Sequence, residues 1–225
     1  MKNNEYILNC LAEKQVSLIG FADVSVLDAP ATKGLPYGIC FAIALSAFPS
    51  MGDTPELAYC AEYKNLNARL KEIGLYLEEK IKQKCFAAHA LIRDDKQSRY
   101  NMPLPLKTLA TRAGLGWIGK SATLITEAYG NAVRLGGVLT DMPLETGTPV
   151  EQGRCGACTA CADACPAGAI RGIEWNVNTK RDELIDPFLC DEMHKKRGAP
   201  FGVNGGACGI CIGACPYSQK YMGVL

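Results

Sequence analysis

The sequence predicts an α+β domain followed by a smaller, cysteine-rich domain. Three observations lead to this fold class. Over residues 1–145, apolar β-prone runs alternate with segments whose apolar residues recur at helical steps of three and four. A polar link rich in proline and glycine then runs from Pro143 to Gly153. Eight of the 12 cysteines follow this link, so we place the two domains at residues 1–145 and 150–225.

Composition narrows the class of protein further. The chain has 225 residues, of which 48% are hydrophobic and 21% charged, as in ordinary globular proteins. Its formal net charge of +1 gives no electrostatic signal for nucleic acid or an anionic membrane. The first nine residues have no apolar signal-peptide core, and no apolar run is long enough to span a membrane. We therefore expect a cytoplasmic protein with no membrane partner.

The first half of the α+β domain begins with a helix over residues 3–15, followed by strands at Val16–Val24 and Ile39–Phe48. Next, Asp53 and Glu56 have the spacing of a capping box, which predicts a helix start. This helix is the longest in the chain, because its apolar residues recur at helical steps from Tyr59 to Ile81.

The second half continues with a strand over Phe86–Ile92 and a helix over Pro103–Ala113 that ends at Gly114. Two further strands, at Ser121–Glu127 and Ala132–Thr140, are separated by a short turn-forming segment. We expect these two strands to form a hairpin.

The cysteines of the second domain form two arrays. The first has the spacing C-x2-C-x2-C-x3-C-P and consists of Cys155, Cys158, Cys161, Cys165 and Pro166. In bacterial ferredoxins, three thiolates of such a run bind one [4Fe–4S] cluster and the fourth reaches a second cluster. The second array lacks one member and consists of Cys208, Cys211, Cys215 and Pro216. Cys190 lies between the arrays and can replace the missing thiolate.

Eight thiolates then serve two clusters with four ligands each. We pair Cys155, Cys158 and Cys161 of the first array with Cys215 of the second for one cluster. For the other cluster we pair Cys208, Cys211 and the intervening Cys190 with Cys165 of the first array. Zinc ribbons also use paired C-x2-C units, but zinc does not require the repeated three-residue step to a Cys-Pro. Disulfides would need an oxidising compartment. The remaining cysteines lie among apolar residues and are predicted to be small core residues: Cys10, Cys40, Cys60 and Cys85.

One literal motif match does not fit its context. Gly114–Ser121 matches the phosphate-binding loop G-x-x-x-x-G-K-[ST] and also contains G-x-G-x-x-G. Both motifs need a strand before the glycines and a helix after them, so that a helix N-terminus faces the phosphate. Here a helical pattern precedes the glycines and a β-prone run follows. We therefore reject nucleotide binding and conclude only that the backbone passes close to another chain segment or a flat ligand.

The succession of motifs resembles the epoxyqueuosine reductase family, which is cobalamin-dependent and related to reductive dehalogenases. The similarity is carried by Ala113–Lys120, Leu139–Leu144, the run from Cys155 to Ile170, Cys190, and the residues from Cys208 to Tyr217. It implies a nitroreductase-like α+β domain that holds a base-off cobalamin, beside a bacterial-ferredoxin-like double [4Fe–4S] domain. It also implies that one loop lies against the corrin, namely Gly114, Leu115, Gly116, Trp117, Ile118, Gly119 and Lys120. For Trp117, plain core packing remains an alternative.

The chain departs from the family in two places. An ungapped count puts Tyr100 where the family has its proton-donating aspartate, so we take Tyr100 as the candidate catalytic residue. The sequence also stops at Leu225, without the helical-repeat domain with which the tRNA-acting enzymes grip RNA. Together with the small net charge, this led us to expect that tRNA is not a partner.

The resulting hypothesis is a cobalamin-dependent reductase. A low-potential donor such as ferredoxin or flavodoxin would feed two [4Fe–4S] clusters, which would reduce the corrinoid that acts on a small-molecule substrate or a partner protein. One alternative is a non-catalytic two-cluster electron-transfer protein, or one that reactivates the corrinoid of a partner. Another is a zinc-bound interaction module.

Overall fold

The computed structural model describes residues 2–92, 102–203 and 208–224. The chain forms two compact units that interleave along the sequence. The first, here called the sheet unit, comprises Met1–Ile43, Asn67–Leu115 and Arg134–Val150. The second, here called the cysteine unit, comprises Ala44–Leu66, Gly116–Val133 and Glu151–Leu225. The sequence predicts two consecutive domains, 1–145 and 150–225, whereas these units interleave. The domain boundaries therefore remain a prediction.

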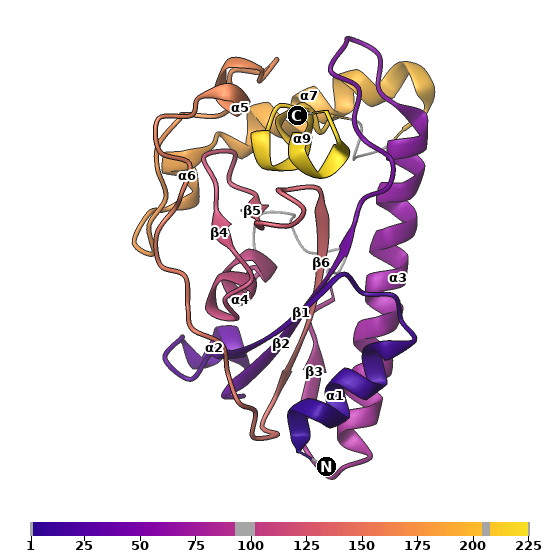
Figure 1. The fold of residues 1–225 in the computed structure, drawn as a ribbon, viewed down its shortest axis with the longest axis vertical. Coiled ribbons are helices and arrows are strands. Elements are labelled where there is room, and N and C mark those ends of the chain that lie inside the picture. The colour runs from indigo at the N-terminus through magenta and orange to yellow at the C-terminus, as the bar shows by residue number, and fades with distance from the viewer. Residues whose placement is uncertain (1, 93–101, 204–207, 225) are drawn as a thin grey trace. The chain divides into compact units, whose positions relative to one another are not determined.

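The sheet unit is built on a four-stranded sheet with the order β1-β2-β6-β3 (Figure 1). Its strands are β1 (Leu18–Asp23), β2 (Tyr37–Ala44), β3 (Ala88–Ala90) and β6 (Val133–Thr140). β1 pairs antiparallel with β2, from Leu18 opposite Ala42 to Asp23 opposite Tyr37, and β3 pairs antiparallel with β6. β1, β3 and β6 lie within the predicted segments, although β3 is shorter than expected. β2 begins at Tyr37, two residues before the predicted start at Ile39, and ends at Ala44, before the predicted end at Phe48.

Helices cover both faces of this sheet. The unit contains α1 (Asn3–Ala12), α2 (Ala29–Thr32), α4 (Leu106–Arg112) and the part of α3 (Leu57–Lys82) from residue 67 onward. A Cβ added at Gly137 would lie 2.7 Å from Leu109 of α4, whereas one at the neighbouring Gly136 would lie 2.4 Å from Phe41. Neighbouring strand residues point to opposite faces, so α4 and Phe41 lie on different sides of the sheet. Such two-sided covering explains the almost continuous burial of β2.

The start of α3 differs from the prediction. The helix begins at Leu57, four residues beyond Asp53, and the Ala58 N–H donates to Glu56 Oε1 at 3.2 Å. The Glu56 carboxylate therefore lies at the helix entrance, and the proposed capping box at Asp53 is wrong. Capping-box spacing alone does not identify a helix start, because the residues after the cap must also adopt helical dihedral angles.

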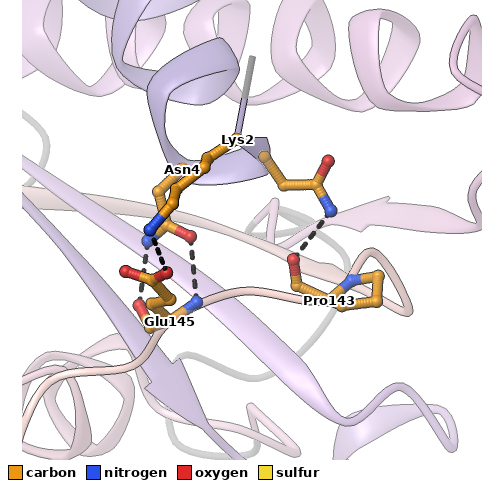
Figure 2. Close-up of polar contacts among 5 residues, drawn as sticks. Lys2, Asn4, Pro143 and Glu145 are labelled. Atoms are coloured by element: carbon orange, nitrogen blue, oxygen red, sulfur yellow. Dashed lines mark hydrogen bonds and ion pairs between the residues drawn. The ribbon is translucent and has the colours of Figure 1, made fainter.

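The N-terminal helix is fastened to the start of the polar link (Figure 2). Asn4 exchanges two hydrogen bonds with the Glu145 backbone, at 2.8 and 2.9 Å, and Lys2 forms an ion pair with the Glu145 side chain at 3.0 Å. Asn3 donates to the Pro143 carbonyl at 2.8 Å. Since the Lys2–Glu145 pair is exposed, it contributes about 0–1 kcal/mol. These contacts mainly fix the direction in which the link leaves β6.

In the cysteine unit, β4 (Trp117–Ile118) pairs antiparallel with β5 (Leu124–Ile125). The predicted hairpin between residues 121–127 and 132–140 is therefore wrong. The strand-like run at 121–127 folds back onto residues 117–118, with a turn in which the Ala122 N–H donates to the Gly119 carbonyl at 2.8 Å. Both runs are β-prone, and propensity does not specify which partner a strand takes.

Short helices make up most of the remaining cysteine unit. They are α5 (Ala160–Asp163), α6 (Arg181–Leu184), α7 (Pro187–Gly198), η1 (Ala199–Phe201), α8 (Ile210–Gly213) and α9 (Pro216–Met222). In the three described ranges, we find no helix that is long and apolar enough to cross a membrane.

Candidate metal centre

Four cysteines of the cysteine unit line one pocket, and they are Cys155, Cys158, Cys161 and Cys215. The first two lie on a turn closed by the Cys158 N–H and the Cys155 carbonyl at 3.1 Å, where Gly156 has a φ of +56°. Cys161 follows in α5, and Cys215 stands at the N-cap of α9 with Pro216 as its first helical residue. The proline directs the chain out of the array and into the helix.

The remaining predicted cluster ligands, Cys165, Cys190 and Cys208, lie near Cys211. Burial raises the pKa of the Cys211 thiol, and its sulfur neighbours raise it further, in the order Cys208, Cys190, Cys161 and Cys165. Burial likewise raises the pKa of Cys161 to about 11, with contributions from Cys155, Cys215 and Cys158. Cys211 thus lies near cysteines of both predicted sets, and the assignment of the eight cysteines to two clusters remains a prediction. Thiols with raised pKa values become thiolate ligands when a metal displaces their protons.

This arrangement fits an iron–sulfur cluster better than a single ion. Among the described residues, no three His, Cys, Asp or Glu side chains are placed to hold one metal ion. A tetrahedral zinc site would require that arrangement. In a [4Fe–4S] cluster each thiolate binds a different iron atom, so the four sulfurs stand around a larger object. The first pocket is further lined by Ile125 and Tyr217, which limit solvent access.

The hydrogen-bonded pair Asn131 and Ser218 lies next to two cysteine-bearing segments. Ser218 Oγ donates to Asn131 Oδ1 at 2.6 Å, and the Asn131 N–H donates back to Ser218 Oγ at 3.0 Å. Asn131 Nδ2 donates to the Cys211 carbonyl at 3.3 Å. The Ser218 and Tyr217 N–H groups favour the Cys215 thiolate, although burial raises its pKa by more than they lower it. Nothing in the sequence indicated this pair, because the two residues lie 87 positions apart.

The glycines of the predicted corrin loop lie against protein. Gly114, in the sheet unit, has a φ of +75°, and a Cβ there would lie 2.9 Å from the Thr148 carbonyl oxygen. In the cysteine unit, a Cβ at Gly116 would lie 2.0 Å from the Ile125 carbonyl oxygen, and one at Gly119 2.3 Å from Ile125 Cδ1. Close approach to other segments of the chain therefore requires these glycines. The element order that argued against a phosphate-binding loop is confirmed, since the loop runs from α4 into the β4–β5 hairpin.

The other residues of the loop are also placed. Ile118 is buried, and Leu115 donates its N–H to the Ala110 carbonyl at 3.0 Å. Trp117 is buried and makes an edge-to-face contact with Tyr217, with ring centroids 5.1 Å apart. Its Nε1 has no hydrogen-bond partner in the part of the chain that the structure describes.

Two charged side chains hold the loop that carries the first cysteines. Lys120 Nζ donates to the carbonyl oxygens of Gly156 at 2.6 Å and Cys158 at 3.0 Å. On the other side, Glu174 Oε1 accepts from the Cys155 N–H at 3.0 Å. Sequence reasoning included Lys120 only as part of the corrin loop and missed Glu174, because a single glutamate gives no indication of its spatial neighbour.

The predicted catalytic residue, Tyr100, lies outside the described residues. Of the cysteines outside the arrays, Cys40 and Cys60 are buried and Cys10 is half-buried, as expected for core residues. Burial alone raises the pKa of Cys40 to about 12, which makes its thiol unreactive. Cys85 is exposed, so the core prediction is wrong for it. It lies in the turn after α3, where its N–H donates to the Lys82 carbonyl.

Comparison with known proteins agrees with this geometry. Residues 154–218 match the family model described as a 4Fe-4S double cluster binding domain. The epoxyqueuosine reductase of Synechocystis is 31% identical over 189 residues, a match that covers 78% of this chain and 58% of the relative. That of Escherichia coli is 37% identical over 134 residues, covering 56% of this chain and 33% of the relative.

Solved structures show the same fold over nearly the whole chain. A selenomethionine-labelled epoxyqueuosine reductase superposes with a TM-score of 0.63 at 19% identity, covering 97% of this chain and 66% of that one. The catabolic reductive dehalogenase NpRdhA superposes with a TM-score of 0.65 at 18% identity, covering 96% and 32%. The α+β fold with a double-cluster domain is therefore confirmed.

The gathered cysteines and the matched domain define a double-cluster iron–sulfur protein with two [4Fe–4S] clusters. Within that class, the chain is a relative of the epoxyqueuosine reductases. It spans about 58% of the Synechocystis relative and a third of the Escherichia coli one.

The expectation that tRNA is not a partner is wrong. One similar structure, with a TM-score of 0.63 at 20% identity, is an epoxyqueuosine reductase with an epoxyqueuosine-modified tRNA stem loop. Net charge is a sum over the whole chain, so a value near zero does not exclude a local RNA-binding surface. The point at which the sequence ends also says nothing about a partner.

Proposed function

We infer that the chain is a cytoplasmic reductase in which two [4Fe–4S] clusters pass electrons to a bound cobalamin. The observation that carries this proposal is the pocket lined by four cysteines, within a chain that matches a double-cluster domain and is related to epoxyqueuosine reductases. Low-potential electrons would come from a donor of the ferredoxin or flavodoxin type. The cobalamin, when bound, would supply the bond-breaking chemistry.

The proposed ligands of the first cluster are Cys155, Cys158, Cys161 and Cys215, and those of the second are Cys165, Cys190, Cys208 and Cys211. The shared pocket supports the first set, and the mutual influence on the Cys211 thiol supports the second. Cys161 also influences Cys211, which indicates that the two groups are adjacent. Adjacent clusters suit a protein that moves electrons in successive steps.

Iron content tests the ligand assignment. Two clusters of four irons give eight irons per chain after anaerobic reconstitution. We expect Cys215→Ala to lose iron from one cluster, since Cys215 is buried and no other thiol replaces it in the pocket. Cys85→Ser is the matched control, because Cys85 is exposed and lies outside both arrays. Full iron content in Cys215→Ala would contradict the assignment.

For cobalamin, the chain's own residues have supporting roles. The loop from Gly114 to Lys120 would lie against the corrin, as in the related enzymes. The unpartnered Trp117 Nε1 supports this role, since an acceptor from a ligand would complete its hydrogen bonding. The close contacts of Gly116 and Gly119 with Ile125 give no separate support, because protein atoms already explain them. Tyr100 remains the proposed proton donor.

An anaerobic titration with cob(II)alamin, followed by EPR, tests cobalamin binding directly. A base-off signal that saturates near one corrinoid per chain would support the proposal. Trp117→Phe keeps the aromatic contact with Tyr217 but lacks the donor, so it should weaken binding by about 1 kcal/mol, or roughly fivefold. An unchanged spectrum of free cobalamin would overturn the cofactor and leave the alternative of a two-cluster electron carrier.

The substrate is tested separately. An epoxyqueuosine-modified tRNA stem loop is the first substrate to offer, since a related enzyme was solved with one. Cluster- and cobalamin-loaded chain would be incubated with a low-potential reductant and the stem loop, and the modified base analysed by mass spectrometry. Loss of one oxygen from the base would identify tRNA as the substrate. If the mass of the base does not change although cobalamin is bound, tRNA is not the substrate under these conditions, and small molecules would be tested next.

A further inference from the structure

Lys120 is a buried cation at the first cysteine pocket. Lys120 is 6% exposed, and it lines this pocket together with Cys155, Cys158, Cys161 and Cys215. Both of its observed hydrogen bonds, at 2.6 and 3.0 Å, go to carbonyl oxygens of the loop that carries the first two cysteines. The residue therefore holds that loop and brings an ammonium group to its inner side.

The charge of Lys120 has no anionic partner among the described side chains. It forms no ion pair with a described carboxylate, and two carbonyl dipoles compensate a buried ammonium only in part. Burial of an unpaired charge is costly, so native proteins place such groups where an opposite charge completes the site. Four thiolates around an iron–sulfur core carry more negative charge than the core can neutralise. A cluster bound to these cysteines would supply the missing counter-charge.

We propose that Lys120 is a positioning residue of the first cluster, which fixes the Cys155–Cys158 loop and raises the midpoint potential of that cluster. Reduction adds one electron to an assembly that is already negative. A nearby cation in a low-dielectric pocket favours the more negative, reduced form over the oxidised one. The inference rests on the proposed ligand set of the first cluster but does not require a bound corrinoid.

The glycine beside Lys120 fits this role. A Cβ added at Gly119 would lie 3.4 Å from Cys155 Sγ and 2.3 Å from Ile125 Cδ1. The backbone that carries Lys120 therefore passes within contact distance of a cluster thiol. Lys120 lies in the turn between β4 and β5, and the hydrogen bonds of its ammonium to the Gly156 and Cys158 carbonyls fix the position of the charge.

Potentiometric titration of the cluster-loaded full chain, monitored by EPR, tests the proposal. Lys120→Gln removes the charge and keeps an N–H donor, whereas Lys120→Arg keeps the charge. We expect one of the two midpoints to become more negative in Lys120→Gln by about a tenfold change in the reduced-to-oxidised ratio, or about 59 mV for a one-electron couple. Lys120→Arg should restore that midpoint toward the wild-type value. The second midpoint should stay unchanged in both variants.

Lys220→Met is the matched control, since it removes one exposed lysine from α9 of the same unit. It should move neither midpoint, because solvent and salt screen an exposed charge. Iron content is measured on every variant. Loss of four irons in Lys120→Gln but not in Lys120→Arg would also support the proposal, as it would show that the first cluster needs this cation.

Three results would overturn the inference. One is an unchanged pair of midpoints in Lys120→Gln with full iron content. Another is an equal shift of both midpoints, which would indicate a change of the whole fold. The third is loss of iron in Lys120→Arg as well as Lys120→Gln, which would show that side-chain shape matters and charge does not. Failure to bind cobalamin would overturn the proposed function without affecting any of these readouts.

Discussion

Replacement of Gly130 by alanine should destabilise the cysteine unit through one identified contact. Gly130 has a φ of +56°, and a Cβ there would lie 2.2 Å from the Ser218 backbone nitrogen and 2.4 Å from Ser218 Oγ. Ser218 is 0% exposed and lies in the first turn of α9, three residues after the proposed ligand Cys215. Since the obstructing atom belongs to the backbone, a change of side-chain rotamer cannot relieve the clash.

The magnitude follows from two separable costs. A left-handed backbone costs an alanine about 1–2 kcal/mol, and overpacking against a fixed neighbour costs about 1–3 kcal/mol more. Gly168 provides the control, because its φ is +57° and nothing lies within 4 Å of the corresponding Cβ position. Gly168→Ala therefore bears only the first cost. Both replacements restrict the unfolded chain in the same way, so their difference isolates the clash.

The assay is the apparent melting temperature of the cluster-loaded chain under anaerobic conditions. For a chain of this size, 1 kcal/mol corresponds to about 2–4 °C. The Gly168→Ala variant should thus melt about 2–8 °C lower than the wild type, and Gly130→Ala about 4–20 °C lower. Gly130→Ala should also lose iron from the first cluster faster. Equal losses of melting temperature in the two variants would refute the contact between Gly130 and Ser218.

Two further predictions concern carboxylates. Glu174→Gln keeps an acceptor for the Cys155 N–H but removes a negative charge. EPR-monitored titration should therefore show the midpoint potential of the first cluster shifted by about 59 mV to more positive values, opposite to the shift in Lys120→Gln. A shift to more negative potential would contradict this prediction. For Glu78, burial raises the pKa, but hydrogen bonds from Lys82 and the Ala90 N–H outweigh it and hold the pKa below its usual value. Its stabilising contribution is therefore complete above the unfolded pKa of about 4.3 and is lost as the pH falls through the lower folded value. Glu78→Gln should flatten the acid limb of melting temperature against pH, and an unchanged limb would count against it.

The elements with the strongest periodic signal were predicted well. In α3, the predicted apolar face is buried at Tyr59, Leu66, Leu70, Ile73, Leu77 and Ile81, as the helical steps required. The strands β1 and β6 lie within their predicted segments, and β2 overlaps its predicted segment from Ile39 to Ala44. Strand pairing was predicted wrongly where a β-prone segment had more than one possible partner strand. Residues 121–127 are β-prone, but the sequence does not say that they pair with residues 117–118 rather than with 132–140.

For the site, the sequence by itself determined which cysteines are candidates. The two-, two- and three-residue steps of the first array and the similar steps of the second are local properties, because this spacing lets a short loop direct several thiolates at one cluster. Cys190 was predicted as the eighth ligand because the second array lacks one cysteine and Cys190 lies between the two arrays. The family resemblance was likewise carried by short, contiguous motifs.

Only the tertiary structure decided what surrounds those cysteines. Lys120 reaches Gly156 and Cys158 across 36 and 38 residues, and the Asn131–Ser218 pair spans 87. Contacts of this kind depend on how the chain packs, and no periodicity or spacing encodes them. The potential and stability of a cluster depend on such neighbouring charges and hydrogen bonds. Local spacing therefore specifies the ligands, while packing places the charges that tune them.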